Sequence, residues 1–315
     1  MSEWGGALEI VPQVAEALAG RTPIVLFESA VLSHGLPADV ALHTVDDMTR
    51  DVAEAGALAA TVAVLDGRII VGVSPYDLPR LTRGGVVKIA ERDLPAAVAL
   101  GHTGGTTVSA TIAVADLVGA PVVATGGIGG VHLGADRSWD VSADLPALAA
   151  HPVAVVCAGA KAICDIPKTL EFLETAGVTV VGFQTDRFPF FLAVDSGSPV
   201  PRRIETPAQV AALMRAKRAL MQRGGLVLAN PIPAPAGLDR VVVMQAVAAA
   251  QREADRAGAS GSDLTPFLLA ALASITQGAS LRANAALLRA NARLAARVAG
   301  AIAATGQEGS ARYGS

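Results

Sequence analysis

Short apolar runs typical of buried strands alternate with helical patterns along most of this chain, and two of these runs end in loops of small residues. Runs 121–124 and 153–156 contain no polar residue, as expected for parallel strands covered on both faces. The first leads into 126–130, where four of the five residues are glycine, and the second leads into 157–161, which ends in Lys161. Ligands of open α/β sheets bind beyond the carboxyl ends of the strands. The two loops therefore predict a binding site on an α/β fold.

The remaining patterns predict one α/β domain over residues 1–315, with a helical C-terminal layer. Asp66-Gly67 between two apolar runs predicts a hairpin, and Ser74-Pro75 predicts the start of a helix. We expect the tail from about residue 306 to be frayed. Strands are expected at 23–27, 59–65, 68–73, 86–90, 121–124, 153–157, 178–183 and 225–229. Helices are expected at 9–18 and, in the C-terminal layer, at 240–257, 265–275 and 281–304.

The composition restricts the class of protein. Hydrophobic residues make up 52% and charged residues 17% of the chain, so a large core is expected. So few charges also predict that surface is buried between subunits of a homo-oligomer. The net charge of −3 argues against nucleic acid as a partner, and no apolar run reaches the length of a membrane span. Residues 1–6 lack a basic-then-apolar leader pattern, so we expect a cytoplasmic protein.

Neither the cysteines nor the glycines match a cofactor motif. Cys157 and Cys164 fit neither a disulfide framework nor zinc spacing, and we interpret both as buried small residues. The run 126–130 has neither the GxGxxG register nor a GxxxxGK[ST] pattern, so no nucleotide cofactor is expected. A tight turn with positive φ is the alternative to a ligand-lining loop, but four glycines exceed what one turn requires.

Residues 104–108, which include Thr107 and Val108, form a candidate phosphate site at the start of a helical pattern. Free amides and the helix dipole attract an anion there, and threonine hydroxyls add donors. Ser142 and the amides around it could complete the pocket. The alternative is that threonine is an ordinary helix cap.

Three charged residues lie where apolar segments would bury them. Glu28 closes the run 23–27, so burial is expected to raise its pKa towards general-acid use, with a structural cap as the alternative. Lys161 follows a strand and is expected at the head of a helix, where it can act as an amine nucleophile on a sugar aldehyde. A surface lysine is the alternative. Lys88 lies between apolar neighbours and is likewise poorly placed for solvation.

Other polar residues allow two interpretations each. Asp140 could hold a hard divalent ion largely through water, or Asp140 and Asp144 could both cap the next helix. His34 and His132 are more commonly loop hydrogen-bonding residues than catalysts. Asn284, within a helical pattern, could face the site or cross-link helices.

From about residue 11 to about residue 300 the chain resembles the pseudouridine-5′-phosphate glycosidases, also called the indigoidine synthase A-like group. So many matches in the family's order make the resemblance specific. The matching motifs are Glu28-Ser29, Ser33-His34-Gly35, Arg92-Asp93-Leu94, 125–132, 142–145, 157–161, 229–233, 265–269, and Ser280-Leu281 with Asn284.

The resemblance implies an α/β/α sandwich with a central mixed, mostly parallel sheet, assembled as a homotrimer. It also implies cleavage or formation of the C–C glycosidic bond between ribose 5-phosphate and uracil. Lys161 would attack C1′ and Glu28 would protonate the ring oxygen, so that the ribose opens to an imine and the bond to carbon 5 of uracil breaks. Lys88 would steady the sugar or base during proton transfer, with His132 and Asn284 nearby.

Metal and phosphate contacts follow from the same resemblance. Asp140 matches the family's Mn²⁺ ligand, with one ion in each subunit. Val108, Ser142, Ala143 and Asp144 match its contacts to the substrate phosphate.

The chain departs from the family's usual pattern near the base. Ala30 stands where threonine is usual, Glu91 stands where a basic residue or histidine is usual, and 38–43 replaces an aromatic or basic stretch. The sugar-phosphate and Schiff-base positions are kept, so these departures leave the aglycone open between uracil and a larger aromatic. A C-glycosynthase that joins ribose 5-phosphate to a polyketide-type aglycone is therefore the alternative, and a non-catalytic sugar-phosphate binder is a third hypothesis.

Overall fold

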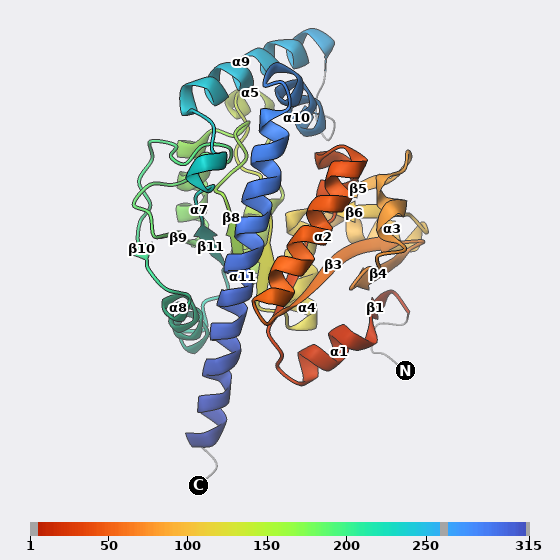
Figure 1. The fold of residues 1–315 in the computed structure, drawn as a ribbon, viewed down its shortest axis with the longest axis vertical. Coiled ribbons are helices and arrows are strands. Elements are labelled where there is room, and N and C mark those ends of the chain that lie inside the picture. The colour runs from red at the N-terminus through yellow and green to blue at the C-terminus, as the bar shows by residue number, and fades with distance from the viewer. Residues whose placement is uncertain (1–5, 259–263, 313–315) are drawn as a thin grey trace.

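One sheet runs through the molecule (Figure 1). The computed structural model describes residues 6–258 and 264–312, without the side chains of residue 265 and of residues 306–312. Within these residues eleven strands follow the order β1-β4-β3-β2-β7-β8-β11-β9-β10, with β6 beside β3 and β5 beside β6. The strands are β1 (Leu8–Ile10), β2 (Ile24–Phe27), β3 (Leu58–Leu65), β4 (Arg68–Val71), β5 (Val87–Ile89), β6 (Gly104–Thr106), β7 (Val122–Ala124), β8 (Ala154–Cys157), β9 (Thr179–Phe183), β10 (Arg203–Ile204) and β11 (Leu226–Ala229).

Helices cover both faces of the sheet, and the longest of them, α11, runs along the whole body to the C-terminal end (Figure 1). The helices are α1 (Pro12–Ala19), α2 (Ala38–Glu54), α3 (Leu94–Ala99), α4 (Val108–Val118), α5 (Ala135–Ser138), α6 (Asp144–Ala150), α7 (Ile166–Thr175), α8 (Pro207–Ala219), α9 (Arg240–Ala257), α10 (Leu264–Ile275) and α11 (Ala279–Arg312).

The sheet is mixed and mostly parallel, as predicted. Strand β3 is antiparallel to β4 and β6, and the β3–β4 pair is the hairpin expected around Asp66-Gly67. Strands β2, β7, β8 and β11 are parallel to their neighbours in the centre, so their carboxyl ends lie along one edge. Their side chains are buried on both faces, which explains the continuous apolar runs in the sequence.

The direction of winding reverses between β2 and β7. The chain passes from β2 through α2 to β3 on one side, and from β7 through α6 to β8 on the other. Right-handed crossovers then place α2 and α6 on opposite faces. Helix α11 packs on β2, β7 and β8 beside α2 and α8, while α4, α6 and α7 form the other layer. The predicted α/β/α sandwich with a helical C-terminal layer is confirmed, and its switch point is where ligands of such sheets bind.

The structure differs from the local expectations in two places. Ser74 and Asp77 bond to each other and close a turn, so the expected helix is replaced by a short 3₁₀ helix at Leu78–Thr82. Strands β1 and β6 were not expected, because each is only three residues long and depends on remote partners. Helix α11 is continuous to Arg312, and fraying from about residue 306 stays a prediction. Residues 313–315 lie outside the described part.

The structure also bears on the two cysteines and on membrane spans. Cys157 and Cys164 are free and buried, as predicted, and burial raises the pKa of each thiol to about 12. Among the helices that the structure describes, none combines the length and apolarity needed to cross a bilayer.

A histidine, His151, joins three elements of the fold. The His151 ring bonds through Nδ1 to Asp116 Oδ2 (2.8 Å) at the end of α4, and through Nε2 to Glu91 Oε1 (3.0 Å) in the turn after β5. Burial works to lower the pKa of His151, but the hydrogen bonds to the two carboxylates outweigh it and raise the pKa overall. Glu91, a departure from the family pattern, is thereby explained as a partner of His151.

Because the folded state raises the pKa of His151, the charged ring stabilises the fold below the unfolded pKa of about 6.5, and this stabilisation disappears as the pH rises through the folded pKa. We expect a His151→Gln variant to have a lower Tm than the wild type at pH 5.5 and a smaller difference at pH 9. The exposed His102→Gln serves as the matched control. An equal loss of Tm at both pH values would contradict the charge-based explanation.

Candidate active site

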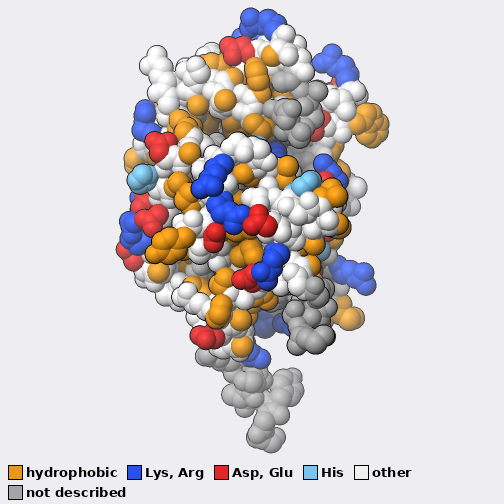
Figure 2. All heavy atoms as spheres, turned by 90° about the vertical axis from the view of Figure 1, so that its right-hand side faces the viewer, with side chains coloured by type: hydrophobic (Ala, Val, Ile, Leu, Met, Phe, Trp, Pro, Cys, Tyr) orange, Lys and Arg blue, Asp and Glu red, His pale blue; other side chains and the backbone are white. Residues whose placement is uncertain are grey.

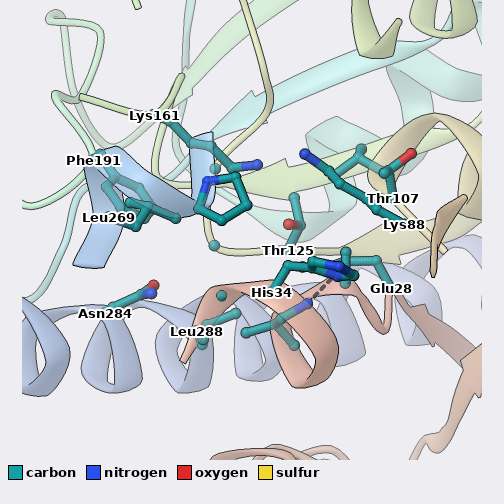
Figure 3. Close-up of a pocket in the computed structure, with 17 residues that line it drawn as sticks. Glu28, His34, Lys88, Thr107, Thr125, Lys161, Phe191, Leu269, Asn284 and Leu288 are labelled. Carbon is teal, nitrogen blue, oxygen red and sulfur yellow. Dashed lines mark hydrogen bonds between the residues drawn. The ribbon is translucent and has the colours of Figure 1, made fainter. Parts of the chain in front are cut away.

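A pocket opens at the switch point, beyond the carboxyl ends of β2, β7 and β8 (Figure 3). The structure brings six of the predicted site residues into its lining: Glu28, Lys88, Thr107, Val108, Lys161 and Asn284. Ala30, expected near the base, and Gly126 and Gly127 of the predicted ligand-lining loop also lie in the lining. The sequence interpretation assigned no pocket role to other lining residues, which include Val31, Phe191, Pro266, Leu269 and Leu288.

Lys161 is held by an extension of the sheet, not by a helix as expected. The loops after β7 and β8 continue the parallel pairing at Ile128 and Ala160, and the Lys161 amide donates to the Ile128 carbonyl (2.9 Å). Helix α7 begins only at Ile166, after Gly159 has taken a left-handed conformation (φ 79°). The expectation of a helix head at Lys161 was therefore wrong.

The two lysines face each other across the pocket. Figure 3 shows the amine of Lys161 directed towards that of Lys88, which comes from the short strand β5. Burial lowers the pKa of Lys88, and the neighbouring charge of Lys161 lowers it further, while Asp144 and Glu28 oppose both effects. Lys88 is thus a partly buried amine whose proton is easier to remove than that of a surface lysine.

Glu28 approaches the lysines from the end of β2. The amide of Val31 donates to Glu28 Oε2 (2.9 Å), from the first position of a π-helical turn at Val31–Gly35. Burial raises the pKa of Glu28, and the opposing effects of Lys161 and of the Val31 amide do not cancel this rise. The predicted rise is confirmed, and it keeps a larger fraction of this carboxyl protonated near neutral pH, as a general acid requires.

The glycine loop 126–130 is required by close packing, not by backbone conformation. None of its glycines has a positive φ. A Cβ on Gly126 would lie 3.2 Å from Asn284 Oδ1, and one on Gly127 would lie 2.8 Å from the Phe191 ring. A Cβ on Gly129 would collide with Ser142 Oγ. The tight-turn alternative is therefore excluded, and Gly126 and Gly127 line the pocket as expected.

The candidate phosphate region lies at the start of α4. Thr107 and Val108 line the pocket, and Thr107 Oγ1 lies 2.9 Å from Ser109 Oγ. Asp144 is 4% exposed, and its carboxylate accepts hydrogen bonds from the amides of Ser109 (2.8 Å) and Gly129 (2.7 Å). The Asp144 side chain therefore ties helix α4 to the glycine loop. Ser142 and Ala143 are partly buried beside it, outside the pocket lining.

His132 and Asp140 lie beside the pocket. The His132 amide donates to the Asp140 carbonyl (3.0 Å), and its Nδ1 lies 3.7 Å from Asp140 Oδ2. Burial lowers the pKa of His132, although the Asp140 carboxylate opposes this effect, and the charges of Lys161 and Lys88 lower it further. In the described residues, no group of three or more His, Cys, Asp or Glu side chains has the arrangement of a metal centre. Asp140 could therefore hold an ion only with water supplying most ligands.

The far wall of the pocket comes from elements remote in sequence. Asn284 and Leu288 come from α11, Pro266 and Leu269 from α10, and Phe191 from the segment after β9. This wall is apolar apart from the Asn284 amide. Phe191 had no sequence signal, because its position depends on a hydrogen bond from its amide to the Ala158 carbonyl (3.0 Å).

The face of the molecule shown in Figure 2 carries charges of both signs. Figure 2 shows basic and acidic side chains interleaved on the side seen from the right of Figure 1, with no continuous basic stripe on that side. This agrees with the net charge of −3.

Comparison with known proteins gives a family and close structural neighbours. Residues 13–301 match the family model described as indigoidine synthase A like protein. The pseudouridine-5′-phosphate glycosidase of Paracoccus denitrificans is 47% identical over 94% of this chain and 98% of its own. The enzyme of the same name from Methylobacterium nodulans is 48% identical over 94% of this chain and 88% of its own.

Two solved structures share the fold. The prealnumycin C-glycosynthase AlnA, solved in complex with ribulose 5-phosphate, superposes with a TM-score of 0.88 and 34% identity, covering 96% of this chain and 98% of AlnA. An indigoidine synthase A-like protein from Thermotoga maritima superposes with a TM-score of 0.85 and 34% identity, covering 93% of this chain and 95% of that protein.

Proposed function

The chain belongs to the indigoidine synthase A-like family of enzymes, and from this premise we propose that it is a pseudouridine-5′-phosphate glycosidase acting reversibly on the C–C bond between ribose 5-phosphate and uracil. The observation that carries the proposal is the shared pocket of Lys161, a buried acid at Glu28 and a second lysine at Lys88. A sugar-phosphate binder has no need of an amine beside a general acid.

In the proposed reaction, the Lys161 nitrogen displaces the ring oxygen from C1′, and Glu28 donates its proton to that oxygen. The nitrogen, now positively charged, returns a proton to the Glu28 carboxylate. Its lone pair then forms a C=N bond while the bond between C1′ and carbon 5 of uracil breaks. The electron pair of that bond remains on carbon 5, which takes up a proton, and Lys88 is the acid that we assign to this step. Water hydrolyses the imine and releases ribose 5-phosphate, which restores the free Lys161 amine.

The phosphate is proposed to bind at the start of α4. Amides at a helix N-terminus attract anions, and Thr107 and Val108 lie there at the edge of the pocket. Ser142 and the backbone of 143–144 are proposed to complete the site. We assign phosphate binding to the backbone of Asp144 and not to its carboxylate, because both carboxylate oxygens already accept hydrogen bonds from backbone amides. His132 and Asn284 are proposed to orient the substrate on either side of Lys161.

We expect incubation with pseudouridine 5′-phosphate and Mn²⁺ to release free uracil, measured by chromatography. Pseudouridine without the phosphate is the matched control, because it lacks the group proposed to bind at α4. Absence of uracil from the phosphorylated substrate would reject the glycosidase.

Mn²⁺ is proposed to bind at Asp140, one ion in each subunit. A single carboxylate that is 29% exposed suits a hard ion that keeps most of its water, and such an ion supplies positive charge near the sugar phosphate. We expect Asp140→Asn to weaken Mn²⁺ binding by about tenfold or more, measured by the EPR signal of free Mn²⁺. The exposed Asp136→Asn is the control. Equal Mn²⁺ affinity in the two variants would remove Asp140 from the site.

A homotrimer in the cytoplasm is also proposed. The low charged fraction of 17% and the exposed apolar side chains of Trp139, Leu220 and Met221 support buried contacts between copies. Analytical ultracentrifugation tests the assembly, and a monomer at micromolar concentration would contradict it. Cell fractionation tests the location.

A C-glycosynthase is the second candidate, favoured by the likeness to AlnA and by Ala30 in the pocket lining. A small residue there leaves space for an aglycone larger than uracil. Incubation with ribose 5-phosphate and either uracil or a polyketide-type aromatic separates the two candidates. Product from uracil alone would reject the synthase.

A further inference from the structure

A buried asparagine on α11 binds the backbone of the glycine loop. Asn291 is 1% exposed, and its Nδ2 donates to the carbonyls of Thr125 (2.8 Å) and Gly126 (3.3 Å). Only the NH₂ end of the amide can face two carbonyls, so the Oδ1 atom must face the other way. It accepts a hydrogen bond from Asn230 Nδ2 (2.9 Å). Asn291 thus makes three directed hydrogen bonds inside the fold.

The partner asparagine is itself fixed to the sheet. Asn230 follows β11, and its backbone N–H donates to the carbonyl of Cys157 at the end of β8 (2.8 Å). The pair Asn230–Asn291 therefore connects α11 to both loops that form the pocket, since Cys157 leads into the loop of Lys161.

The same helix presents substrate-facing groups to the pocket. Asn284 and Leu288 precede Asn291 by seven and three residues, so all three lie on one face of α11. Gly126, whose carbonyl accepts from Asn291, also approaches the side chain of Asn284. A shift of α11 relative to the loop would therefore move Asn284 along the pocket wall.

On its α2 side, α11 is held by ion pairs of Arg289 and Arg293 with Asp51. The other buried residues of the helix are mostly alanines and leucines, whose contacts are non-directional. A single buried asparagine can specify the register of packed helices where apolar contacts alone do not.

We propose that Asn291, oriented by Asn230, is a positioning residue that sets the register of α11 on the glycine loop and so places Asn284 against the aglycone. The inference rests on the proposed function. It predicts that loss of the Asn291 bonds disturbs the uracil half of the reaction and leaves imine formation with ribose 5-phosphate intact.

The test uses Asn291→Leu, which keeps the volume and removes the hydrogen bonds, and Asn230→Ala, which removes only the orienting partner. Val298→Ala is the matched control, because Val298 is 0% exposed and lies on the same helix face seven residues further from the pocket. Four quantities are to be compared between the variants and the wild type. They are the KM values for uracil and for ribose 5-phosphate in the synthetic direction, kcat, Tm, and the yield of the ribose 5-phosphate imine trapped with borohydride.

Both asparagine variants are expected to raise the KM for uracil by about tenfold, the effect of one displaced hydrogen-bonding group, with the trapping yield unchanged. Val298→Ala is expected to lower Tm without changing either KM. The proposal would be overturned if the asparagine variants lower the Tm without changing the KM for uracil, or if they raise both KM values equally. If Asn291→Leu does not fold, Asn230→Ala decides the outcome alone. A wild-type enzyme that cannot be trapped would instead reject the proposed function itself.

Discussion

Replacing Lys161 with alanine is expected to lower kcat by about ten-thousand-fold or more, because no other described group in the pocket is placed to take over its attack on C1′. Binding of the sugar phosphate should persist, since the phosphate is proposed to bind at the start of α4 through groups other than the lost amine. Turnover is measured by uracil release, and binding by calorimetry with ribose 5-phosphate.

Borohydride trapping identifies the nucleophile directly. Wild-type enzyme reduced in the presence of ribose 5-phosphate should gain the mass of one reduced adduct, and peptide mapping should place it on Lys161. Lys168→Ala is the matched control, because Lys168 is a half-exposed lysine seven residues further along the chain that pairs with Asp165. An adduct on Lys88, or residual turnover in Lys161→Ala, would refute the assignment.

Replacing Glu28 with glutamine is expected to lower kcat by about a hundredfold to ten-thousand-fold, the range for loss of a positioned general acid. Glutamine keeps the size and can still accept the Val31 hydrogen bond, but it has no proton to donate. The exposed Glu171→Gln provides the control. Full activity of Glu28→Gln would show that the ring oxygen is protonated by another group.

The pH profile gives an independent check of Glu28. Burial raises the pKa of this carboxyl, so the acid form persists to higher pH than for a surface glutamate and is lost as the pH rises through that pKa. Wild-type kcat/KM should therefore fall on the alkaline side of this pKa, and this fall should be missing from the residual activity of Glu28→Gln. The same fall in both enzymes would assign it to a different group.

The central architecture could be predicted from sequence because local and global signals agree there. Apolar runs such as 153–156 are too short for helices and are bounded by glycine loops, so they indicate parallel strands and their shared carboxyl edge. Charged residues that follow such runs, including Glu28 and Lys161, are therefore expected to lie close together at that edge. Their grouping in one pocket follows from topology more than from any single motif.

What the sequence could not show depends on partners remote along the chain. Asn291 and Phe191 carry no local pattern, and each acquires its role from the loops after β7 and β8. The helix expected at Lys161 failed for a similar reason. Pairing with Ile128 extended the sheet past the strand end, and local helical propensity was overridden.

The packing of the glycine loop has a consequence for redesign. Side chains cannot be added at Gly126, Gly127 or Gly129 without displacing Asn284, Phe191 or Ser142, so this loop does not tolerate larger residues. A directed-evolution library for new C-nucleosides should therefore leave that loop untouched. Diversity belongs at Ala30 and Leu269, which line the same cavity but lie outside the glycine loop.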